Sequence, residues 1–180
     1  MQVSGGANKG TRLVYPARGL RPTKDLVKKA ILNSLRASIP GSRIADLYCG
    51  AGALGIEALS AGAASVVFVE QDRRIVRFLK ANLKPWPGRA RIIAGDVLRV
   101  IPRLSGSDFD IVIADPPYER GLDRATLDAI ARFNLLVAGG LVVLEHSRRD
   151  NAVAPIELRL MRNYRFGDTV VSVFQRMDAY

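Results

Sequence analysis

Residues 43–55, with the sequence Arg-Ile-Ala-Asp-Leu-Tyr-Cys-Gly-Ala-Gly-Ala-Leu-Gly, decide the fold of this chain. An apolar strand over 44–48 leads into a turn that contains Gly50 and Gly52, and a helical pattern follows it. Glycine permits backbone conformations and close approaches that a side chain forbids. The free N–H groups at the start of the helix point to the same place. The stretch therefore predicts a cradle for a nucleotide cofactor.

The rest of the chain continues this alternation of strands and helices. Strands are predicted at 43–48, 65–70, 90–94, 109–114 and, after Gly139 and Gly140, at 141–146. Helices are predicted at 23–37, 53–61, 73–84, 97–104 and 123–133, and two extended segments at 156–164 and 168–176 end the chain. The strands are continuous apolar runs, which indicates a sheet covered on both faces. We therefore predict an α/β fold, Rossmann-like and doubly wound, with a mainly parallel seven-stranded sheet and a C-terminal antiparallel hairpin.

The charge balance favours a polyanionic partner. The 180 residues include 27 Lys and Arg against 17 Asp and Glu, a net charge of +10. For one small domain this favours nucleic acid, although a basic surface that only aids solubility stays open. Residues 1–22 are expected to form a basic arm or small hairpin rather than a packed element, followed by one domain over 23–180. The candidate phosphate contacts are Arg12, Arg21, Lys24, Arg120, Arg148 and Arg149.

The glycine turn alone leaves the cofactor open. Gly50, Gly52 and Gly55 match G-x-G-x-x-G, and Glu70 ends the next strand, so a NAD-dependent dehydrogenase is a real alternative. Asp46 favours a different ligand, because a charge within an apolar strand is costly without a partner. S-adenosylmethionine carries an ammonium group and a sulfonium and has no phosphate. The expected cofactor-binding residues are Asp46, Cys49, Gly50, Ala51, Gly52, Glu70, Gln71, Gly95, Asp96, Val97 and Asp115.

Two of these acids have a plausible role at the ends of later strands. Glu70 can accept hydrogen bonds from both ribose hydroxyls, and Asp96 can accept one from the adenine amine. Asp96 is equally compatible with a simple helix N-cap. Parallel strands of such sheets end at the crevice that binds ligands, so the acids are expected to meet there.

The Asp-Pro-Pro-Tyr turn at 115–118 is the candidate catalytic element. Its prolines fix the backbone, so the carbonyl directions are set in advance. The Asp115 carboxylate and the Pro116 carbonyl can each accept one N–H of an exocyclic amine and turn its lone pair towards a methyl group. Pro117 stiffens the turn, and Tyr118 can stack on a base that has left its helix. Positioning would then supply most of the rate, with the cofactor supplying the methyl group.

Taken together, Asp-Leu-Tyr-Cys-Gly-Ala-Gly (46–52), Val-Glu-Gln-Asp (69–72), Gly-Asp (95–96) and Asp-Pro-Pro-Tyr resemble the class I methyltransferases that use S-adenosylmethionine and act on exocyclic amines. With Arg-Pro-Thr-Lys-Asp (21–25) and the segment 52–70, nearly the whole chain resembles the RsmD family, the 16S ribosomal RNA guanine-N2 methyltransferases. Members typically have Ser or Thr at the position of Ala51. The resemblance implies RNA in an assembled or assembling small ribosomal subunit as the substrate. It also implies methionine binding by Asp46, Gly50 and Gly52, ribose binding by Glu70, adenine binding by Asp96, and guanine binding by residues 115–118.

Other functions have less support in the sequence. An adenine-N6 DNA methyltransferase shares the 115–118 motif, but the chain has no room for the separate target-recognition domain of those enzymes. A non-catalytic ribosome-binding module would not need that motif. Cys49 is read as a small packing residue, His146 as a satisfied histidine at the end of a strand, and no Cys/His cluster indicates a metal. The single cysteine cannot form an internal disulfide and favours a cytoplasmic protein, and no apolar run has the length of a membrane span. One core without an obvious hydrophobic patch favours a monomer.

Overall fold

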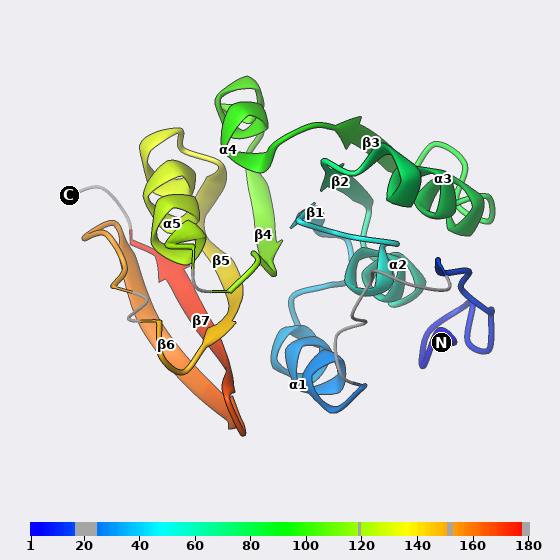
Figure 1. Ribbon diagram of the computed structural model, residues 1–180, viewed down its shortest axis with the longest axis horizontal. Coiled ribbons are helices and arrows are strands. Elements are labelled where there is room, and N and C mark those ends of the chain that lie inside the picture. Colours follow the sequence, from blue (N-terminus) through cyan, green and yellow to red (C-terminus); the bar gives the residue numbers. More distant parts are fainter. Residues whose placement is uncertain (17–24, 119, 151–152, 178–180) are drawn as a thin grey trace.

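The computed structural model describes residues 1–16, 25–118, 120–150 and 153–177. Its seven-stranded sheet has the order β3-β2-β1-β4-β5-β7-β6 (Figure 1). The first five strands in the chain run parallel, and β7 is antiparallel to both β5 and β6. The predicted mainly parallel sheet with a C-terminal hairpin is therefore confirmed. The strands are β1 (Arg43–Leu47), β2 (Ser65–Glu70), β3 (Ala90–Ala94), β4 (Phe109–Ala114), β5 (Leu136–Ser147), β6 (Leu158–Phe166) and β7 (Thr169–Arg176).

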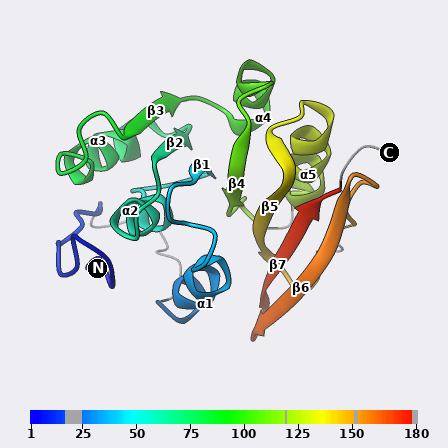
Figure 2. The ribbon, with the colours of Figure 1, turned by 180° about the vertical axis from the view of Figure 1, so that it is seen from behind.

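Helices cover both faces of the sheet (Figures 1 and 2). One face is covered by α1 (Asp25–Leu35), α2 (Ala53–Ser60) and α3 (Arg73–Asn82), and the other by α4 (Val97–Val100), the 3₁₀ helix η1 (Ile101–Leu104) and α5 (Leu122–Arg132). Successive residues of β1 alternate between the two cores, since Ile44 lies in the first and Ala45 and Leu47 lie in the second. In the part of the chain that is described, none of the helices has the length and apolarity needed to cross a membrane.

Strand β5 begins earlier than predicted. Gly139 and Gly140 were expected to precede a strand at 141–146, but they lie inside β5, which starts at Leu136. The pairing of β5 with β4 shifts register between Phe109 and Ile111, since Phe109 lies opposite Leu136 and Ile111 opposite Leu141, which leaves three more residues on β5 than on β4. Glycine inside a strand is typical of such a bulge rather than of a strand end. The start predicted for the first helix, at 23–24, lies outside the described residues.

The N-terminal segment packs on the core, contrary to expectation. A bridge between Gln2 and Arg12 closes residues 1–16 into a small hairpin. Val3 and Leu13 are buried in the same core as α1 and α2. The prediction of an arm that does not pack is therefore wrong for these residues. Val3 stands alone among polar residues and glycines, and Leu13 lies in the short stretch Arg12-Leu13-Val14-Tyr15, so the sequence shows no apolar period that joins the two.

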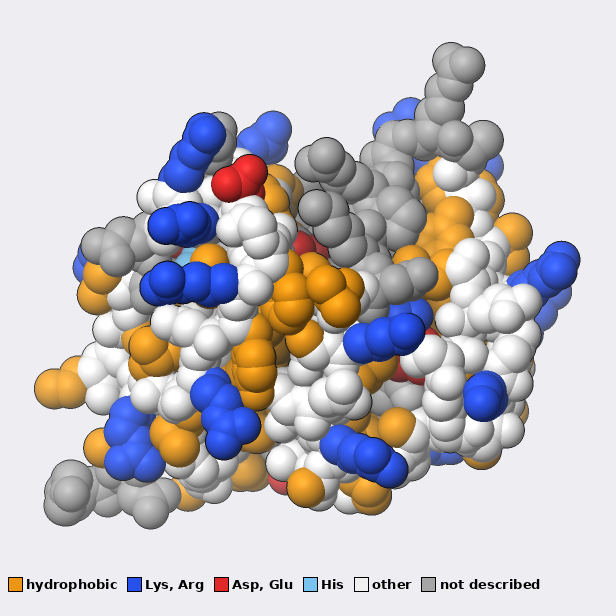
Figure 3. Space-filling model, turned by 90° about the horizontal axis from the view of Figure 1, so that it is seen from below, with side chains coloured by type: hydrophobic (Ala, Val, Ile, Leu, Met, Phe, Trp, Pro, Cys, Tyr) orange, Lys and Arg blue, Asp and Glu red, His pale blue; other side chains and the backbone are white. Residues whose placement is uncertain are grey.

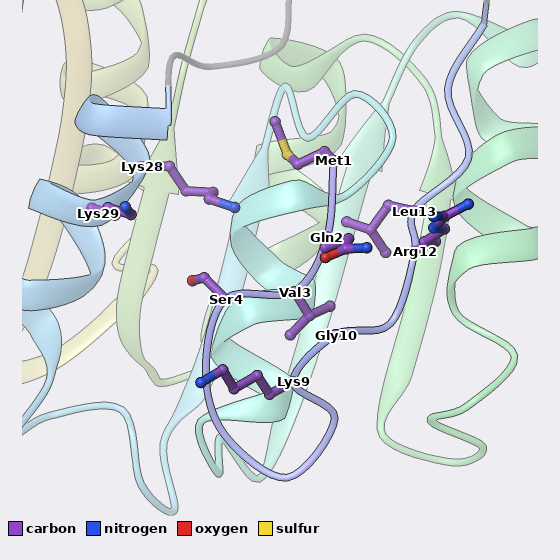
Figure 4. A pocket seen from close by; sticks show the side chains of 10 residues that line it. All are labelled: Met1, Gln2, Val3, Ser4, Lys9, Gly10, Arg12, Leu13, Lys28 and Lys29. Carbon is purple, nitrogen blue, oxygen red and sulfur yellow. The ribbon is translucent and has the colours of Figure 1, made fainter.

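A buried ion pair fixes this hairpin to the domain. Lys28 of α1 donates to Glu57 Oε1 of α2 at 2.9 Å, and both side chains are almost fully buried. The backbone N–H of Ser4 donates to the same oxygen at 2.7 Å. Figure 4 shows Lys28 reaching from α1 towards the hairpin, beside a cavity of about 710 Å³ that Arg12 also lines. Removal of Lys28 would leave the buried Glu57 carboxylate without its ion-pair partner, which is costly.

Candidate active site

Asp46 supports the glycine turn from beneath. Its Oδ2 accepts the backbone N–H of Gly55 at 2.8 Å, and its side chain is buried. A Cβ on Gly55 would lie 2.3 Å from the Phe68 ring and 2.8 Å from Asp46 Oδ2, so only glycine fits there. Burial raises the pKa of Asp46 to about 7, with the Gly55 hydrogen bond opposing the rise and Glu70 adding to it. Asp46 thus sets the start of α2 through a hydrogen bond to the backbone.

Glu70 supports the same turn from the end of β2. Its Oε2 accepts the N–H of Gly50 at 3.0 Å, and its Oε1 accepts the N–H of Asp72 at 2.7 Å. Gly50 has φ of 56°, a conformation that favours glycine. The carboxylate is therefore held at the cavity wall by the two loops that follow β1 and β2.

Asn82 connects the glycine turn to the N-terminal hairpin. Its Oδ1 accepts the N–H of Val14 at 2.7 Å, and its Nδ2 donates to the carbonyls of Val14 and Ala51, each at 3.0 Å. The next residue, Tyr15, lines the same cavity as the glycine turn. Sequence reasoning missed this contact, because an Asn at a helix end carries no signal for a partner 68 residues away.

A cavity of about 770 Å³ lies at the carboxyl ends of the parallel strands. Most of the predicted site residues line it: Cys49, Gly50, Ala51, Glu70, Gln71, Asp96, Val97, Asp115, Pro116, Pro117, Tyr118, Arg120 and Arg149. The residues that do not line it are Asp46, Gly52, Gly95, Arg12 and Arg148, and Arg21 and Lys24 lie outside the described residues. The strand ends thus bring the acids and the 115–118 turn into one cavity, as the fold predicts.

Asp96 has two possible roles in this cavity. Its Oδ1 accepts the N–H of Arg99 at 3.1 Å and so caps the short helix α4. The residue is also exposed and lines the cavity, so the cap does not remove it from the site. Both uses predicted from the sequence are compatible with this position.

The 115–118 turn contacts Glu145 and Thr169, which no motif in the sequence marks as site residues. The Tyr118 hydroxyl donates to Glu145 Oε1 at 2.8 Å and lies 3.2 Å from Thr169 Oγ1. Burial raises the pKa of Tyr118, and the nearby carboxylates of Glu145 and Asp115 raise it as well. The hydroxyl therefore stays protonated at neutral pH and can donate. Further cavity residues missed from the sequence are Tyr48, Ser147 and Asp168.

Cys49 and His146, the two other side chains that could act as a nucleophile or a base, are placed as packing residues rather than as catalytic ones. Burial, followed by the charges of Asp46 and Glu70, raises the pKa of the Cys49 thiol well above its ordinary value. A thiol that stays protonated is a poor nucleophile. His146 is buried, with Nδ1 at 3.0 Å from the Ser147 carbonyl and Nε2 at 2.8 Å from Ser172 Oγ, in agreement with a satisfied histidine. Within the described ranges, no three His, Cys, Asp or Glu side chains gather in a way that could hold a metal ion.

The chain is similar to known proteins over nearly its whole length. The family model described as conserved hypothetical protein 95 matches residues 1–175. The chain belongs to this family. Among its relatives, Ribosomal RNA small subunit methyltransferase D of Escherichia coli K12 is 32% identical, over 98% of this chain and 90% of that protein. YlbH of Bacillus subtilis is also 32% identical, over 98% of this chain and 99% of YlbH. The resemblance to the RsmD family is thereby confirmed.

Solved structures of methyltransferases share the fold. The structure of yhhF from Escherichia coli is 31% identical, has a TM-score of 0.90, and the match covers 98% of both chains. SMU.776, which was solved as a complex with SAH, has a TM-score of 0.71 at 14% identity, over 88% of this chain and 51% of that one. At that identity only the fold is shared. The Rossmann-like class I methyltransferase fold is thus established for this chain.

Proposed function

We propose that this protein transfers a methyl group from S-adenosylmethionine to the exocyclic N2 amine of a guanine in 16S ribosomal RNA of the small subunit. The observation that carries the proposal is the single cavity shared by Glu70, Asp96 and the 115–118 turn. The name of the Escherichia coli relative, Ribosomal RNA small subunit methyltransferase D, supports ribosomal RNA as the substrate. The guanine and its N2 atom rest on the resemblance of the motifs to the RsmD family.

The residues of the cavity fit S-adenosylmethionine better than a dinucleotide. A pyrophosphate needs free backbone N–H donors at the glycine turn. Here the Gly50 N–H donates to Glu70, so the turn presents a carboxylate where the phosphates would lie. Carboxylates suit ribose hydroxyls, an adenine amine and a positively charged methionine end instead. A volume of about 770 Å³ is within the range of cofactor sites.

The proposed roles of the protein groups follow from this fit. When bound, S-adenosylmethionine supplies an electrophilic methyl group. Glu70 and Asp96 bind its ribose and adenine, and the backbone around Gly50 contacts its methionine part. The Asp115 carboxylate and Pro116 carbonyl accept the two N–H groups of the target amine and stabilise the positive charge that develops on the nitrogen. The Tyr118 ring stacks on the guanine.

Basic residues near the cavity support an RNA substrate. Arg120 and Arg149 line its rim, while Arg12 lines the separate cavity beside the N-terminal hairpin. Figure 3 shows one face of the molecule on which Lys and Arg side chains are spread widely and few acidic side chains are visible. We infer that these cations contact RNA phosphates and that the protein acts as a monomer in the cytoplasm. RNA affinity should then fall steeply with salt, because phosphate contacts release counterions.

The proposal is tested by offering labelled S-adenosylmethionine with transcribed 16S RNA, small subunits and DNA in parallel reactions. Label should enter RNA or small subunits, and digestion with mass spectrometry should find N2-methylguanine. Incorporation into DNA alone would favour the adenine-N6 alternative instead. In a thermal-shift assay, S-adenosylhomocysteine should stabilise the protein and NAD should not. The reverse result would favour the dehydrogenase.

A further inference from the structure

The Tyr118 side chain is held at its hydroxyl by two distant segments. Glu145 belongs to β5 and Thr169 begins β7, 27 and 51 residues from Tyr118 in the chain. Both strands pair along this end, with Glu145 opposite Val171 and Ser147 opposite Thr169. The two oxygens are therefore fixed by the sheet, whereas Tyr118 stands on a turn outside any regular element.

Glu145 and Thr169 are buried, whereas Tyr118 is partly exposed. Glu145 is 6% exposed and Thr169 is 8% exposed, while Tyr118 is 37% exposed. The hydroxyl end thus contacts buried groups, and much of the rest of the side chain stays open. All three residues line the large cavity, on the same side as the 115–118 turn. Hydrogen bonds at the hydroxyl fix the direction of the long axis of the ring and so its place in the cavity, and the ring face is the part left for a ligand.

We propose that Glu145 is a positioning residue, which with Thr169 fixes the Tyr118 ring so that its face meets the target base in the cavity. The proposal rests on the proposed function and adds a role for two residues of the C-terminal half. Its physical content is preorganisation, because an unrestrained tyrosine loses rotational freedom when it stacks on a base. The bond to the carboxylate is charge-assisted and so stronger than the one to Thr169.

The proposal is tested by a double-mutant cycle of Tyr118→Phe and Glu145→Ala. Glu145→Ala should lower kcat about tenfold, since it removes the hydrogen bond to a charged group, and Tyr118→Phe should lower it somewhat further, since it also removes the bond to Thr169. The double variant should lose no more than Tyr118→Phe alone, because Glu145 acts through the Tyr118 hydroxyl. Glu145→Gln keeps an acceptor oxygen and should recover most of the loss. Glu157→Gln, which removes an exposed carboxylate outside the cavity, is the matched control.

Binding constants separate positioning from a loss of structure. The Kd for S-adenosylhomocysteine should change less than twofold in the Glu145 variants, because the contact lies away from the glycine turn. Additive losses in the double variant would overturn the proposal, and so would an equal loss of kcat in Glu145→Gln and Glu145→Ala. A fall in cofactor affinity that matches the fall in kcat would also overturn it, since that pattern indicates general damage.

A readout without catalysis tests the contact itself. In protein with ¹³Cζ-labelled tyrosine, the Tyr118 resonance is assigned by its absence from Tyr118→Phe. It should move in Glu145→Ala and stay near its original position in Glu145→Gln. An unchanged resonance in Glu145→Ala overturns the proposal whatever the activity. A different result is that the wild-type protein methylates no RNA while the Tyr118 resonance still moves in Glu145→Ala. That result would overturn the proposed function and would support the contact between Glu145 and Tyr118.

Discussion

At the glycine turn buried carboxylates bond backbone N–H groups, whereas at the 115–118 end of the same cavity side chains bond one another. Asp46 accepts from Gly55, and Glu70 accepts from Gly50. At the other end, Tyr118 donates to Glu145. The first kind of contact fixes the path of a loop, and the second fixes the direction of one side chain. Changes at the first end should therefore alter cofactor affinity or stability, and changes at the second should alter transfer.

Asp115→Ala should separate the two ends of the cavity most clearly, because it should reduce methyl transfer and leave cofactor affinity nearly unchanged. Transfer should fall by a factor of about 1,000, because positioned acid–base and electrostatic groups contribute on that scale. The Kd for S-adenosylhomocysteine should stay within a few fold of wild type, since the glycine turn is untouched. Single-turnover transfer from labelled cofactor and calorimetric titration measure the two effects. Asp128→Ala removes an exposed carboxylate from α5 and serves as the control. Transfer by Asp115→Ala at the wild-type rate would remove the turn from the chemistry.

The glycine-turn end was the more predictable from sequence. Asp46, the glycines and Glu70 belong to one strand–turn–helix–strand pattern, so their neighbourhood follows from the local sequence and the topology of a parallel sheet. Glu145 and Thr169 carry no such signal. Glu145 reads as one polar residue before His146 at a strand end, and it meets Tyr118 because β4 pairs with β5, with Ala114 opposite Leu144. Thr169 joins them because β7 pairs with β5. Which side chain lies opposite a turn depends on long-range register, and local patterns do not contain it.

The N-terminal hairpin differs from the sequence-based prediction for the same reason, namely contacts between segments that are far apart in the chain. The sequence predicts all seven strands, but the N-terminal hairpin was expected to stay unpacked. Its burial depends on Val3 and Leu13 meeting α1 and α2, and on Asn82 meeting Val14. These contacts join segments far apart in the chain. The division into an arm over 1–22 and a domain over 23–180 stays a prediction.

Asp46→Asn should have the next largest effect, on stability. The pKa of Asp46 is raised to about 7 in the fold from 3.8, so the folded state holds a proton that the unfolded state releases. The stability that this bound proton contributes to the fold is fully present below about pH 4 and is lost as the pH rises to about 7. The upper bound for this loss is about 4 kcal/mol. Asn does not titrate, so the variant should lack this part of the pH dependence.

The measurement is the free energy of urea unfolding of both proteins between pH 4 and 8. The difference between wild type and Asp46→Asn isolates this residue, because the other titrating groups are shared. Wild type should lose stability relative to the variant as the pH rises from 5 to 7, and the difference should level off above that. Parallel curves would show that Asp46 keeps its ordinary pKa in the fold.

Glu70→Gln should weaken cofactor binding by about tenfold. Both carboxylate oxygens accept backbone N–H groups, and the amide nitrogen of Gln cannot accept a bond from Gly50 or Asp72. The Kd for S-adenosylhomocysteine should rise, while kcat at saturating cofactor changes little. Asp110→Asn is the matched control, because Asp110 Oδ2 also accepts a backbone N–H, from Arg43 at 2.7 Å, but does not line the cavity. A lower kcat with unchanged affinity would assign Glu70 to the other end of the cavity.

Thr169→Val should have the smallest effect, and it tests whether Thr169 acts only through the Tyr118 hydroxyl. Valine keeps the shape of threonine and removes only the hydroxyl, which lies 3.2 Å from the Tyr118 hydroxyl. Because this bond joins two neutral groups, its loss should lower kcat about two- to threefold, less than the loss of the Glu145 carboxylate. The same substitution in a Tyr118→Phe background should then change kcat no further, since the bond is already absent. A further loss in that background would mean that Thr169 acts on the base or the cofactor directly, and the target end would consist of two independent contacts rather than one network around Tyr118.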